Sequence, residues 1–432
     1  MWPRVKRMCI LYTLTVLFLV ICVWYTRPGS FRSYKEYYSK KQLQNLYFNR
    51  PCNTRHIPCS SFFDSTINLT ELALQYRIEY DEDELEDEEL GTDCVSIFSR
   101  SNFFMEPMSK EESEFSIAYA RNVNTDYHFH EITLSTTYAP QNFYCYSIDG
   151  KADETFVKRL EDLTKCLPNV FVTDFREPMT SLGILKWYGG ANDITTQLRG
   201  RKVNFTWDFE SLHLFKDSDR NRLVVDGNMP DFLLSRGAVQ SVISHEAVDF
   251  IVNKLDLNQT IFQLNSDMWS VDEYLTSSIN SNDNIQLPGG FTRKCYETAG
   301  IVLAMNKYNV WLRNESFCKS KIWRHGVCVF GAEDLLSNLL DNPFFVANKM
   351  VPTTDFGAIV CWNEVLFNRT YHDRGLHRLN KRLYTKLPHV RYHKAKKKYG
   401  VNFDFNKFDC AKHVKDHIGT NILPSGIYIL EG

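Results

Sequence analysis

The chain has 432 residues, of which 44% are apolar and 14% are aromatic, and its formal net charge at pH 7 is −2. This composition is typical of a well-packed globular protein and argues against a chain that is disordered throughout. The nearly balanced charge indicates no particular class of partner. A zinc site is disfavoured, because the sequence contains no Cys-x-x-Cys pair.

The first 25 residues have the features of a membrane anchor. Arg4, Lys6 and Arg7 precede an apolar run over residues 8–25. At about 1.5 Å per residue this run nearly spans a hydrocarbon core about 30 Å thick. The positive charges predict a cytoplasmic tail over residues 1–7 and a luminal position for everything after the run. A cleaved signal peptide is the alternative, but the run is long for one and no small-x-small cleavage site follows it.

The sequence beyond the apolar run is typical of a luminal protein. Five glycosylation sequons follow it, at Asn68, Asn204, Asn258, Asn314 and Asn368. Their glycosylation requires luminal exposure. Ten of the 12 cysteines also lie beyond the run, and an even number of cysteines in an oxidising lumen suggests disulfides.

Residues 26–93 are predicted to form a luminal stem, because they are polar, tyrosine-rich and irregular. Nearly every residue from Asp81 to Glu89 is acidic. A solvated spacer explains this run better than a calcium site does, since no glycine lies among the acids to shape a ligand loop. From Cys94 to residue 370 the pattern changes to alternating strands and amphipathic helices. It predicts a globular region of one large domain or two joined lobes.

The beginning of the globular region has the order of an α/β unit. Strands are expected at 115–120, 142–148 and 170–172, with helices at 126–138 and 153–166 between them. This order implies a parallel sheet that binds ligands beyond the carboxyl ends of its strands. Asp149 follows the second strand, where it can meet a ribose or a base. The turn-forming pair Asp149-Gly150 is an almost equally good structural explanation.

Later segments carry further candidate groups. Residues 237–252 are expected to form a strand, an N-cap at Ser244 and a helix with Ala247, Phe250 and Ile251 facing inward. Asp272-Glu273 is expected to begin another helix. There Glu273 is either a general base or only a partner of the helix dipole.

Basic residues flank a short apolar strand near the end of the globular region. Arg324 and His325 precede this strand, which runs into a Gly-Ala turn and a helix, and Lys349 follows that helix. Cationic groups around such a turn can steady a pyrophosphate, but they can equally be solvated surface charges.

Five blocks of sequence carry a resemblance to a known family. They lie at residues 106–119, 140–149, 271–275, 327–335 and 345–349. In this order and spacing they resemble the core-2/I-branching β-1,6-N-acetylglucosaminyltransferases (glycosyltransferase family 14), over about residues 94–370, and the tract 207–249 resembles nematode-type members. The resemblance implies a GT-A-like nucleotide-sugar glycosyltransferase fold with a mainly parallel central sheet. It also implies a single-pass type II protein of the Golgi membrane with a luminal catalytic domain.

The chemistry that the resemblance implies is metal-independent transfer of N-acetylglucosamine, with inversion, from UDP-N-acetylglucosamine to a glycan or glycoprotein acceptor. No cofactor and no metal is expected, and the linkage formed is a β-1,6 branch, as in O-glycan branching. Inversion requires one carboxylate to take the proton of the acceptor hydroxyl. Glu273 occupies the family's base position.

The resemblance also assigns residues to the donor. Lys349 matches one diphosphate contact, and either Arg324 or His325 matches a second, so that cationic side chains stabilise the leaving UDP. Asp149 falls at a nucleotide-contacting position. Asn122 and Asn124 stand where the family's first strand usually leads to a His-containing turn.

Family pairing implies three disulfides and leaves four luminal cysteines unassigned. The implied pairs are Cys94 with Cys166, Cys318 with Cys328, and Cys59 with Cys361. The unassigned cysteines are Cys52, Cys145, Cys295 and Cys410.

The chain departs from the family pattern at two places. Family members carry a few dozen more residues near the junction 183/184, including a strand whose loss would expose a sheet edge. Either an exon is absent or the protein is a shortened relative. The tail, residues 371–432, is strongly basic and is expected to be solvated and partly disordered, with anionic glycans or lipid headgroups as alternative contacts. Nucleic acid is not expected in the lumen.

Two other functions compete with transfer by this route. Asp217 and Asp219 form an Asp-x-Asp pair of the kind that a metal-dependent glycosyltransferase uses, although their basic surroundings favour a polar loop. The second is a non-catalytic anchored relative that binds a nucleotide sugar or a glycan without turnover. The sequence does not indicate the oligomeric state.

Overall fold

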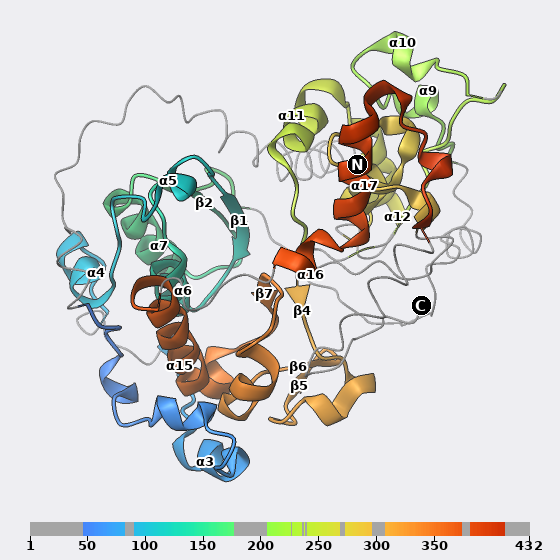
Figure 1. The fold of residues 1–432 in the computed structure, drawn as a ribbon. Coiled ribbons are helices and arrows are strands. Elements are labelled where there is room, and N and C mark those ends of the chain that lie inside the picture. The colour runs from blue at the N-terminus through green and yellow to red at the C-terminus, as the bar shows by residue number, and fades with distance from the viewer. Residues whose placement is uncertain are drawn as a thin grey trace. The chain divides into compact units, whose positions relative to one another are not determined.

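The computed structural model describes residues 46–82, 90–176, 205–225, 227–235, 237, 240–267, 273–295, 307–373 and 381–410. These residues form two compact units (Figure 1). The sheet unit contains the described residues up to 176 together with 308–373. The helical unit contains those from 205 to 307 together with 381–410.

Several predicted features lie outside the described residues. They are the cytoplasmic tail, the apolar run 8–25, most of the acidic run, the junction 183/184 and the sequon asparagine Asn204. None of the helices in the described ranges combines the length and the apolarity needed to cross a membrane.

The sheet unit is built on three parallel strands in the order β1-β2-β3. Its elements up to β3 are η1 (Cys52–Thr54), η2 (Cys59–Phe63), α3 (Leu69–Tyr76), α4 (Cys94–Arg100), α5 (Lys110–Ser113), β1 (Ala118–Val123), α6 (Tyr127–Thr137), β2 (Phe143–Ile148), α7 (Glu154–Cys166) and β3 (Val170–Val172). The predicted α/β order and parallel sheet are therefore confirmed.

The first strand lies three residues later than its apolar run suggests. Ala118 pairs with Phe143 and Val123 with Ile148, whereas Phe115 precedes the strand with its side chain 71% exposed. β1 is the end strand of the sheet among the described elements. Its limits follow the hydrogen-bonding register with β2, and polar Arg121 and Asn122 pair as well as apolar residues do.

The core of this part packs α6 and α7 against the sheet. Leu134 of α6 and Leu160 and Leu163 of α7 are fully buried, and each such side chain contributes roughly 1.5–3 kcal/mol. Asp153 caps α7 by accepting a hydrogen bond from the backbone N–H of Phe156 at 2.7 Å. The 3.6-residue spacing read from the sequence is thus the spacing that forms the core.

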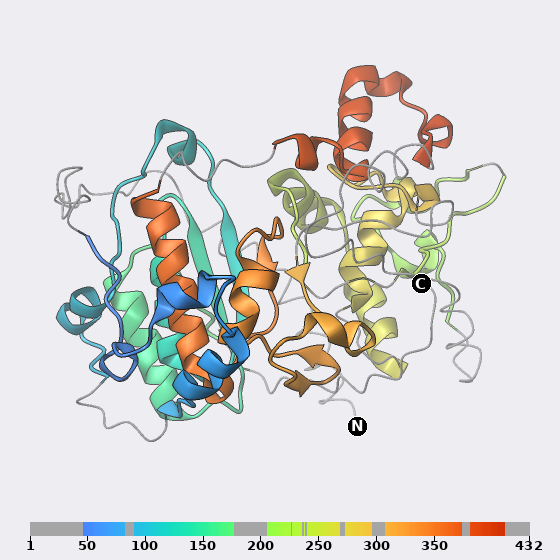
Figure 2. The same ribbon diagram turned by 60° about the horizontal axis from the view of Figure 1, so that its bottom comes forward.

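The second half of the sheet unit consists of short elements and one long helix. They are β4 (Lys307–Tyr308), whose first residue still counts to the helical unit, η6 (Leu312–Phe317), β5 (Trp323–Arg324), β6 (Val327–Cys328), η7 (Ala332–Asp334), the π-helical η8 (Leu335–Leu339), β7 (Val346–Ala347) and α15 (Pro352–Tyr371). β4 pairs with β7, and β5 pairs antiparallel with β6. The helix α15 lies beside α6, and Thr136 Oγ1 donates to Asn363 Oδ1 between them at 2.7 Å (Figures 1 and 2).

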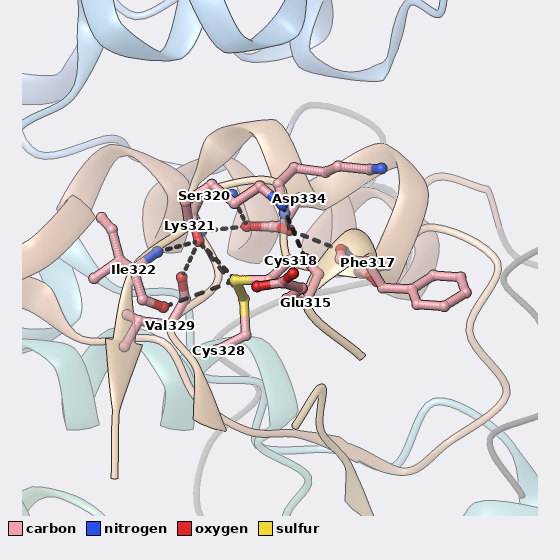
Figure 3. Close-up of a disulfide and its surroundings, with 12 residues drawn as sticks. Glu315, Phe317, Cys318, Ser320, Lys321, Ile322, Cys328, Val329 and Asp334 are labelled. Atoms are coloured by element: carbon pink, nitrogen blue, oxygen red, sulfur yellow. Dashed lines mark hydrogen bonds between the residues drawn. A yellow bond between two sulfur atoms is a disulfide. The ribbon is translucent and has the colours of Figure 1, made fainter. Parts of the chain in front are cut away.

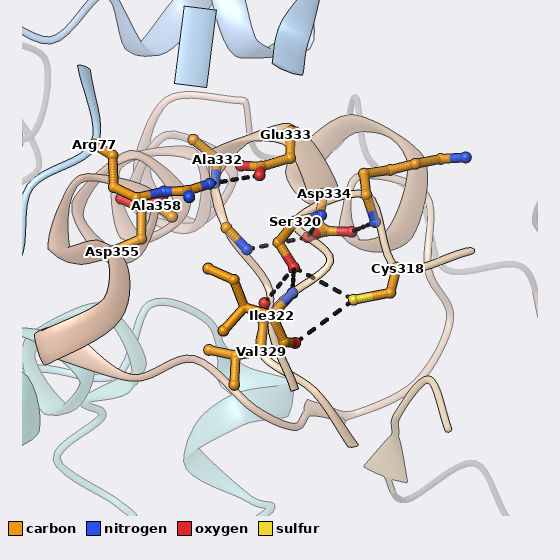
Figure 4. A network of polar contacts seen from close by, with 12 residues as sticks. Arg77, Cys318, Ser320, Ile322, Val329, Ala332, Glu333, Asp334, Asp355 and Ala358 are labelled. Atoms are coloured by element: carbon orange, nitrogen blue, oxygen red, sulfur yellow. Dashed lines mark hydrogen bonds and ion pairs between the residues drawn. The ribbon is translucent and has the colours of Figure 1, made fainter. Parts of the chain in front are cut away.

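Residues 46–82, which fall in the predicted stem, belong to the sheet unit. The Cys59–Cys361 disulfide ties η2 to α15. Arg77 pairs with Glu333 at 2.5 Å and lies 3.6 Å from Asp355 (Figure 4). The globular region therefore begins well before Cys94. A few buried apolar residues and these long-range links fix a segment whose overall composition is polar.

The helical unit has a core of its own. Its elements are α9 (Phe209–Leu212), α10 (Ser218–Asn221), α11 (His245–Lys254), α12 (Asn258–Asp267), α13 (Leu275–Ser281), η5 (Asp283–Ile285), α16 (Lys381–Thr385), α17 (Pro388–Tyr399), η9 (Gly400–Asn402) and η10 (Phe405–Lys407). As predicted, Ser244 caps α11 by accepting from Ala247 N–H at 3.1 Å. Ala247 and Ile251 are buried, with Phe250 packed against the same core.

The expected strand before α11 is wrong over its described part. Residue 237 and residues 240–244 are in no strand. Instead, the backbone groups of Leu233, Ser235 and Gly237 hydrogen-bond to side chains of α13, to the Asn282 side chain after it, and to the turn before it. An apolar, extended segment can meet its hydrogen-bonding needs in this way without a sheet.

The tail is folded over residues 381–410, contrary to the expected solvated extension. Tyr392 of α17 is 4% exposed and packs with Phe291 and Phe408. The Cys295–Cys410 disulfide joins this part to the rest of the helical unit. Tyr392 and Phe408, which stand among the basic residues of the tail, form this apolar cluster. The high charge of the tail therefore does not predict that it is solvated.

Candidate functional site

Three predicted donor residues gather at the carboxyl edge of the parallel sheet. Asn122 is exposed near the end of β1, and Asn124 is exposed just beyond it. Asp149 follows β2, and its backbone N–H donates to Val123 O at 2.9 Å. The sheet register therefore places these three side chains at one edge, where α/β sheets usually bind ligands.

Asp149 also has the structural role that its Asp-Gly sequence suggested. Its Oδ1 accepts a hydrogen bond from Lys151 N–H at 2.9 Å, which closes a turn. Its Oδ2 lies 3.9 Å from Lys151 Nζ, and the Asp149 side chain is 10% exposed. The carboxylate is thus held in one orientation at the end of β2.

The basic residues of the later segment meet at a β-hairpin. β5 and β6 are joined by His325 and Gly326, whose φ angles of 54° and 72° are those of a tight two-residue turn. Lys349 Nζ donates to Arg324 O at 3.2 Å, although the two residues lie 25 apart in the sequence. The hairpin therefore brings Arg324 and His325 together with Lys349; their role toward a diphosphate stays a prediction. Arg324 and His325 are both exposed.

A disulfide and a buried carboxylate hold this hairpin (Figure 3). Cys318 is bonded to Cys328 in β6, and Ser320 Oγ donates to Val329 O at 2.7 Å. Asp334 accepts from the N–H of Lys319 at 2.7 Å and from that of Ser320 at 3.1 Å. Burial raises the pKa of Asp334, and these backbone donors act against that rise. The disulfide and these hydrogen bonds therefore fix the backbone of the hairpin that carries Arg324 and His325.

Glu273, the predicted base, lies in the helical unit just before α13. Hydrogen bonds at Leu233, Ser235 and Gly237 join the earlier segment to this part of the chain. Leu233 exchanges two bonds with the Asn282 side chain, and Ser235 exchanges two with the Ser278 hydroxyl. Gly237 N–H donates to Glu273 O at 2.8 Å. The backbone at Glu273 is thus fixed from outside its own helix.

Gly237 is required where this segment approaches α13. A Cβ atom at this position would overlap Ser277 Oγ and would lie 3.0 Å from Ser277 Cβ. A larger residue here would require the Ser277 hydroxyl to turn away and the segment that carries the Gly237–Glu273 hydrogen bond to shift.

The structure adds one cation that sequence reasoning missed. Lys307 is half-buried and its Nζ donates to Gln240 Oε1 at 2.5 Å. Burial lowers the pKa of Lys307, while the nearby Glu273 carboxylate acts in the opposite direction. A lone lysine in an apolar stretch was the only signal in the sequence. Lys307 therefore provides a charge partner for the predicted base.

The predicted residues fall into two groups by unit. The sheet unit holds Asn122, Asn124 and Asp149 at one edge and Arg324, His325 and Lys349 at one hairpin, and the helical unit holds Glu273.

All three disulfides that the resemblance implied are present. Cys295–Cys410 is additional, Cys52 is free and exposed, and Cys145 is buried in β2.

The alternative metal pair has a local structural role. Asp217 is the N-cap of α10, and its Oδ1 accepts from Asp219 N–H at 3.0 Å. Both side chains are exposed. In the described part of the chain, no group of three or more His, Cys, Asp or Glu residues is arranged to hold a metal ion.

The sequons occupy helix ends and surface positions. Asn68 caps α3 and is exposed, and Asn258 is exposed at the start of α12. Asn314 and Asn368 are partly exposed, in η6 and α15. Glycosylation of these residues stays a prediction.

The architecture described above is that of a disulfide-bonded mixed α/β protein, with polar groups at the carboxyl edge of a parallel sheet. Comparison with known proteins shows which sequences it resembles. The sequence profile described as "Core-2/I-Branching enzyme" matches residues 117–185. These residues include β1, β2 and Asp149.

Curated relatives match over a longer range. A human beta-1,3-galactosyl-O-glycosyl-glycoprotein beta-1,6-N-acetylglucosaminyltransferase 3 is 24% identical over 336 residues, 64% of this chain and 74% of the relative. A Bos taurus beta-1,3-galactosyl-O-glycosyl-glycoprotein beta-1,6-N-acetylglucosaminyltransferase is 24% identical over 326 residues, 63% of this chain and 75% of the relative. The chain thus carries a Core-2/I-Branching match over residues 117–185 and is similar, over somewhat less than two thirds of its length, to these glycosyltransferases.

Proposed function

We propose that this protein transfers N-acetylglucosamine from UDP-N-acetylglucosamine to a glycan of a glycoprotein, forming a β-1,6 branch. The names of the curated relatives support the sugar and the linkage. The observation that carries the proposal is the way the backbone of Glu273 is held near Lys307, because a general base must be fixed in position.

In the proposed reaction, Glu273 acts in a single displacement with inversion. Its carboxylate takes the proton of the acceptor's 6-hydroxyl as the hydroxyl oxygen bonds to the anomeric carbon. The bond from that carbon to the UDP oxygen breaks, and its electron pair leaves with UDP. Such a base typically contributes about 10²–10⁴-fold to the rate.

The leaving diphosphate is proposed to meet the cationic hairpin. Lys349 and Arg324 would stabilise the charge that develops on UDP, without a metal or other cofactor. Arg324 is preferred to His325, since a guanidinium is always charged and matches phosphate with two parallel hydrogen bonds. Asp149, Asn122 and Asn124 would contact the nucleoside in a GT-A-like arrangement.

We also propose that the protein is a single-pass type II protein of the Golgi membrane. The support is the apolar run 8–25 behind three basic residues, together with the sequons and disulfides that follow it.

A transfer assay tests the proposal. The full chain, purified in detergent, is incubated with UDP-N-acetylglucosamine and a galactosyl-N-acetylgalactosamine acceptor in EDTA. The expected result is a product with N-acetylglucosamine attached at a 6-hydroxyl. Transfer that requires an added divalent metal, or a product with retained configuration, would contradict the proposed mechanism.

One observation favours a second function, that of a non-catalytic binder. In the described ranges no strand pairs with the outer edge of β1, and loss of a strand near the junction 183/184 was expected to expose a sheet edge. Under this alternative the protein binds UDP-N-acetylglucosamine or a glycan without turnover. Tight UDP binding by a folded protein that transfers no sugar would identify it.

A further inference from the structure

The sheet unit contains a cavity at the edge opposite to Asp149. Its volume is about 500 Å³, which is within the range of small-molecule sites. Ile117 and Asn142, which immediately precede β1 and β2, line it. Because the six-residue strands run parallel, about 20 Å of sheet separates this cavity from Asp149. It is therefore distinct from the predicted nucleotide-contacting edge.

The lining of this cavity combines aromatic rings with carboxylates. Phe115, Tyr119 and Tyr371 contribute rings, and Glu106, Glu111 and Glu112 contribute carboxylates. No lysine, arginine or histidine is among the lining residues. The cavity is thus apolar along its walls, acidic in charge and without a cation of its own.

The walls of the cavity are fixed before any ligand binds. Tyr144 Oη donates to Thr137 O at 2.7 Å and accepts from Ala139 N–H at 2.9 Å, which locks the end of α6. On another wall, Glu112 accepts from Met108 N–H at 3.0 Å. A site with such support loses little conformational entropy on binding.

The mouth of the cavity exposes apolar groups to solvent. Phe115 is 71% exposed and Ile117 is 40% exposed, and they lie two residues apart. A single exposed aromatic residue needs no explanation, but an exposed ring beside a preformed cavity marks a binding surface.

We propose that this cavity binds a neutral carbohydrate, such as a galactose- or N-acetylgalactosamine-containing unit of a glycoprotein. One face of a pyranose presents C–H groups, which pack on the negatively polarised face of an aromatic ring. Its hydroxyl groups donate hydrogen bonds, which carboxylate oxygens accept. Both kinds of partner line this cavity.

Other ligand classes fit the lining less well. Sialic acid, sulfate and phosphate would bring negative charge to three glutamates with no cation among the lining residues. A fatty acyl chain would take water from the carboxylates and offer no hydrogen bond in return. The inference goes beyond the proposed function, since binding here requires no transfer.

Binding and mapping together test the inference. The full chain carrying Glu273→Gln, in detergent and saturated with UDP, is titrated with galactosyl-N-acetylgalactosamine by calorimetry. A photoactivatable form of the same disaccharide then marks the bound peptides. The expected result is labelling within residues 104–119 or 136–142, and an affinity at least about tenfold weaker in Phe115→Ala.

Matched variants separate this site from others. Phe175→Ala removes another exposed ring of the sheet unit, 63% exposed and outside the cavity, and should leave affinity unchanged. Glu111→Gln should weaken binding without altering thermal stability, because Glu111 is exposed. Labelling confined to the helical unit, or equal affinity in Phe115→Ala and Phe175→Ala, would overturn the inference.

Two further outcomes distinguish the cavity from the proposed enzyme. If the peptide Lys-Phe-Lys labels these residues and the disaccharide does not, the cavity binds polypeptide and the carbohydrate proposal is wrong. If the disaccharide labels the cavity but the wild-type chain transfers no sugar, the proposed function fails while the inference stands.

Discussion

The two units position their predicted functional residues in different ways. In the sheet unit, Asp149 is held by a local turn, and the cationic hairpin is held by a disulfide that spans ten residues. In the helical unit, Glu273 is held by a segment some 40 residues earlier in the chain. Local support leaves a sequence signature, whereas support from a distant segment leaves none.

The largest expected effect concerns the folding of the helical unit. The Cys295–Cys410 bond joins residues 115 apart, and a loop of that size contributes about 4–5 kcal/mol by the chain-entropy account. The double variant Cys295→Ser/Cys410→Ser should therefore lower the free energy of unfolding by about that amount, measured by urea denaturation. Cys52→Ser, at the free exposed cysteine, is the control and should change little. A loss below about 1 kcal/mol in the double variant would show that the tail is not integral to this unit.

The next effect concerns the hairpin of the sheet unit. Lys349→Met removes a cation that is proposed to stabilise the leaving diphosphate, and kcat should fall by about 10²–10³-fold. Lys319→Met is the matched control, because its exposed side chain bonds only to Ser316 O in the same loop. Equal kcat values for the two variants would remove Lys349 from the proposed site.

A smaller effect on kcat is expected from the close approach of Gly237 to Ser277 in the helical unit. Gly237→Ala forces the segment away from Ser277 and so displaces Glu273, which should reduce kcat by about 10–100-fold. Adding Ser277→Gly removes the overlapping side chain and should restore most of the activity. If Gly237→Ala is as active as the wild type, the position of Glu273 does not depend on this contact.

The smallest effect is a pH dependence that originates in the sheet unit. Burial lowers the pKa of His128 to about 4, with Arg100 and Arg159 acting in the same direction and Glu131 against them. The Tyr80 hydroxyl lies 2.8 Å from its Nδ1. Between pH 4 and 6.5 the unfolded chain binds the proton that folded His128 excludes, so stability falls as the pH falls.

The size of this effect follows from the shift in pKa. From pH 6.5 to 5.5 the loss attributable to His128 is about 1 kcal/mol. Unfolding curves of the wild type and His128→Gln at the two pH values measure it, and the variant should show a flatter dependence. An identical slope in both proteins would show that His128 is not the group responsible.

The parts of the fold that were predictable are those with local causes. The spacing of Leu160 and Leu163 predicted α7, and Ser244 predicted the start of α11. Arg324 and His325 lie at one hairpin because a disulfide and a short turn shape it, and Lys349 reaches it by a single hydrogen bond to Arg324 O.

The parts that were missed depend on distant contacts. Residues 46–82 seemed a stem because their composition is polar, but Cys59 and Arg77 join them to the sheet unit. The Lys307–Gln240 contact and the hydrogen bonds around Gly237 link segments that no period or motif connects. Tertiary contacts of this kind appear only once the chain is folded.

The central claim is that Glu273 is the base of a sugar transfer. The most direct test compares Glu273→Gln with Glu246→Gln, an exposed glutamate of the same unit, in the full chain at saturating UDP-N-acetylglucosamine. The account predicts that Glu273→Gln lowers kcat by at least about 10²-fold while UDP affinity is kept, and that Glu246→Gln behaves as the wild type. Undiminished transfer by Glu273→Gln would contradict it.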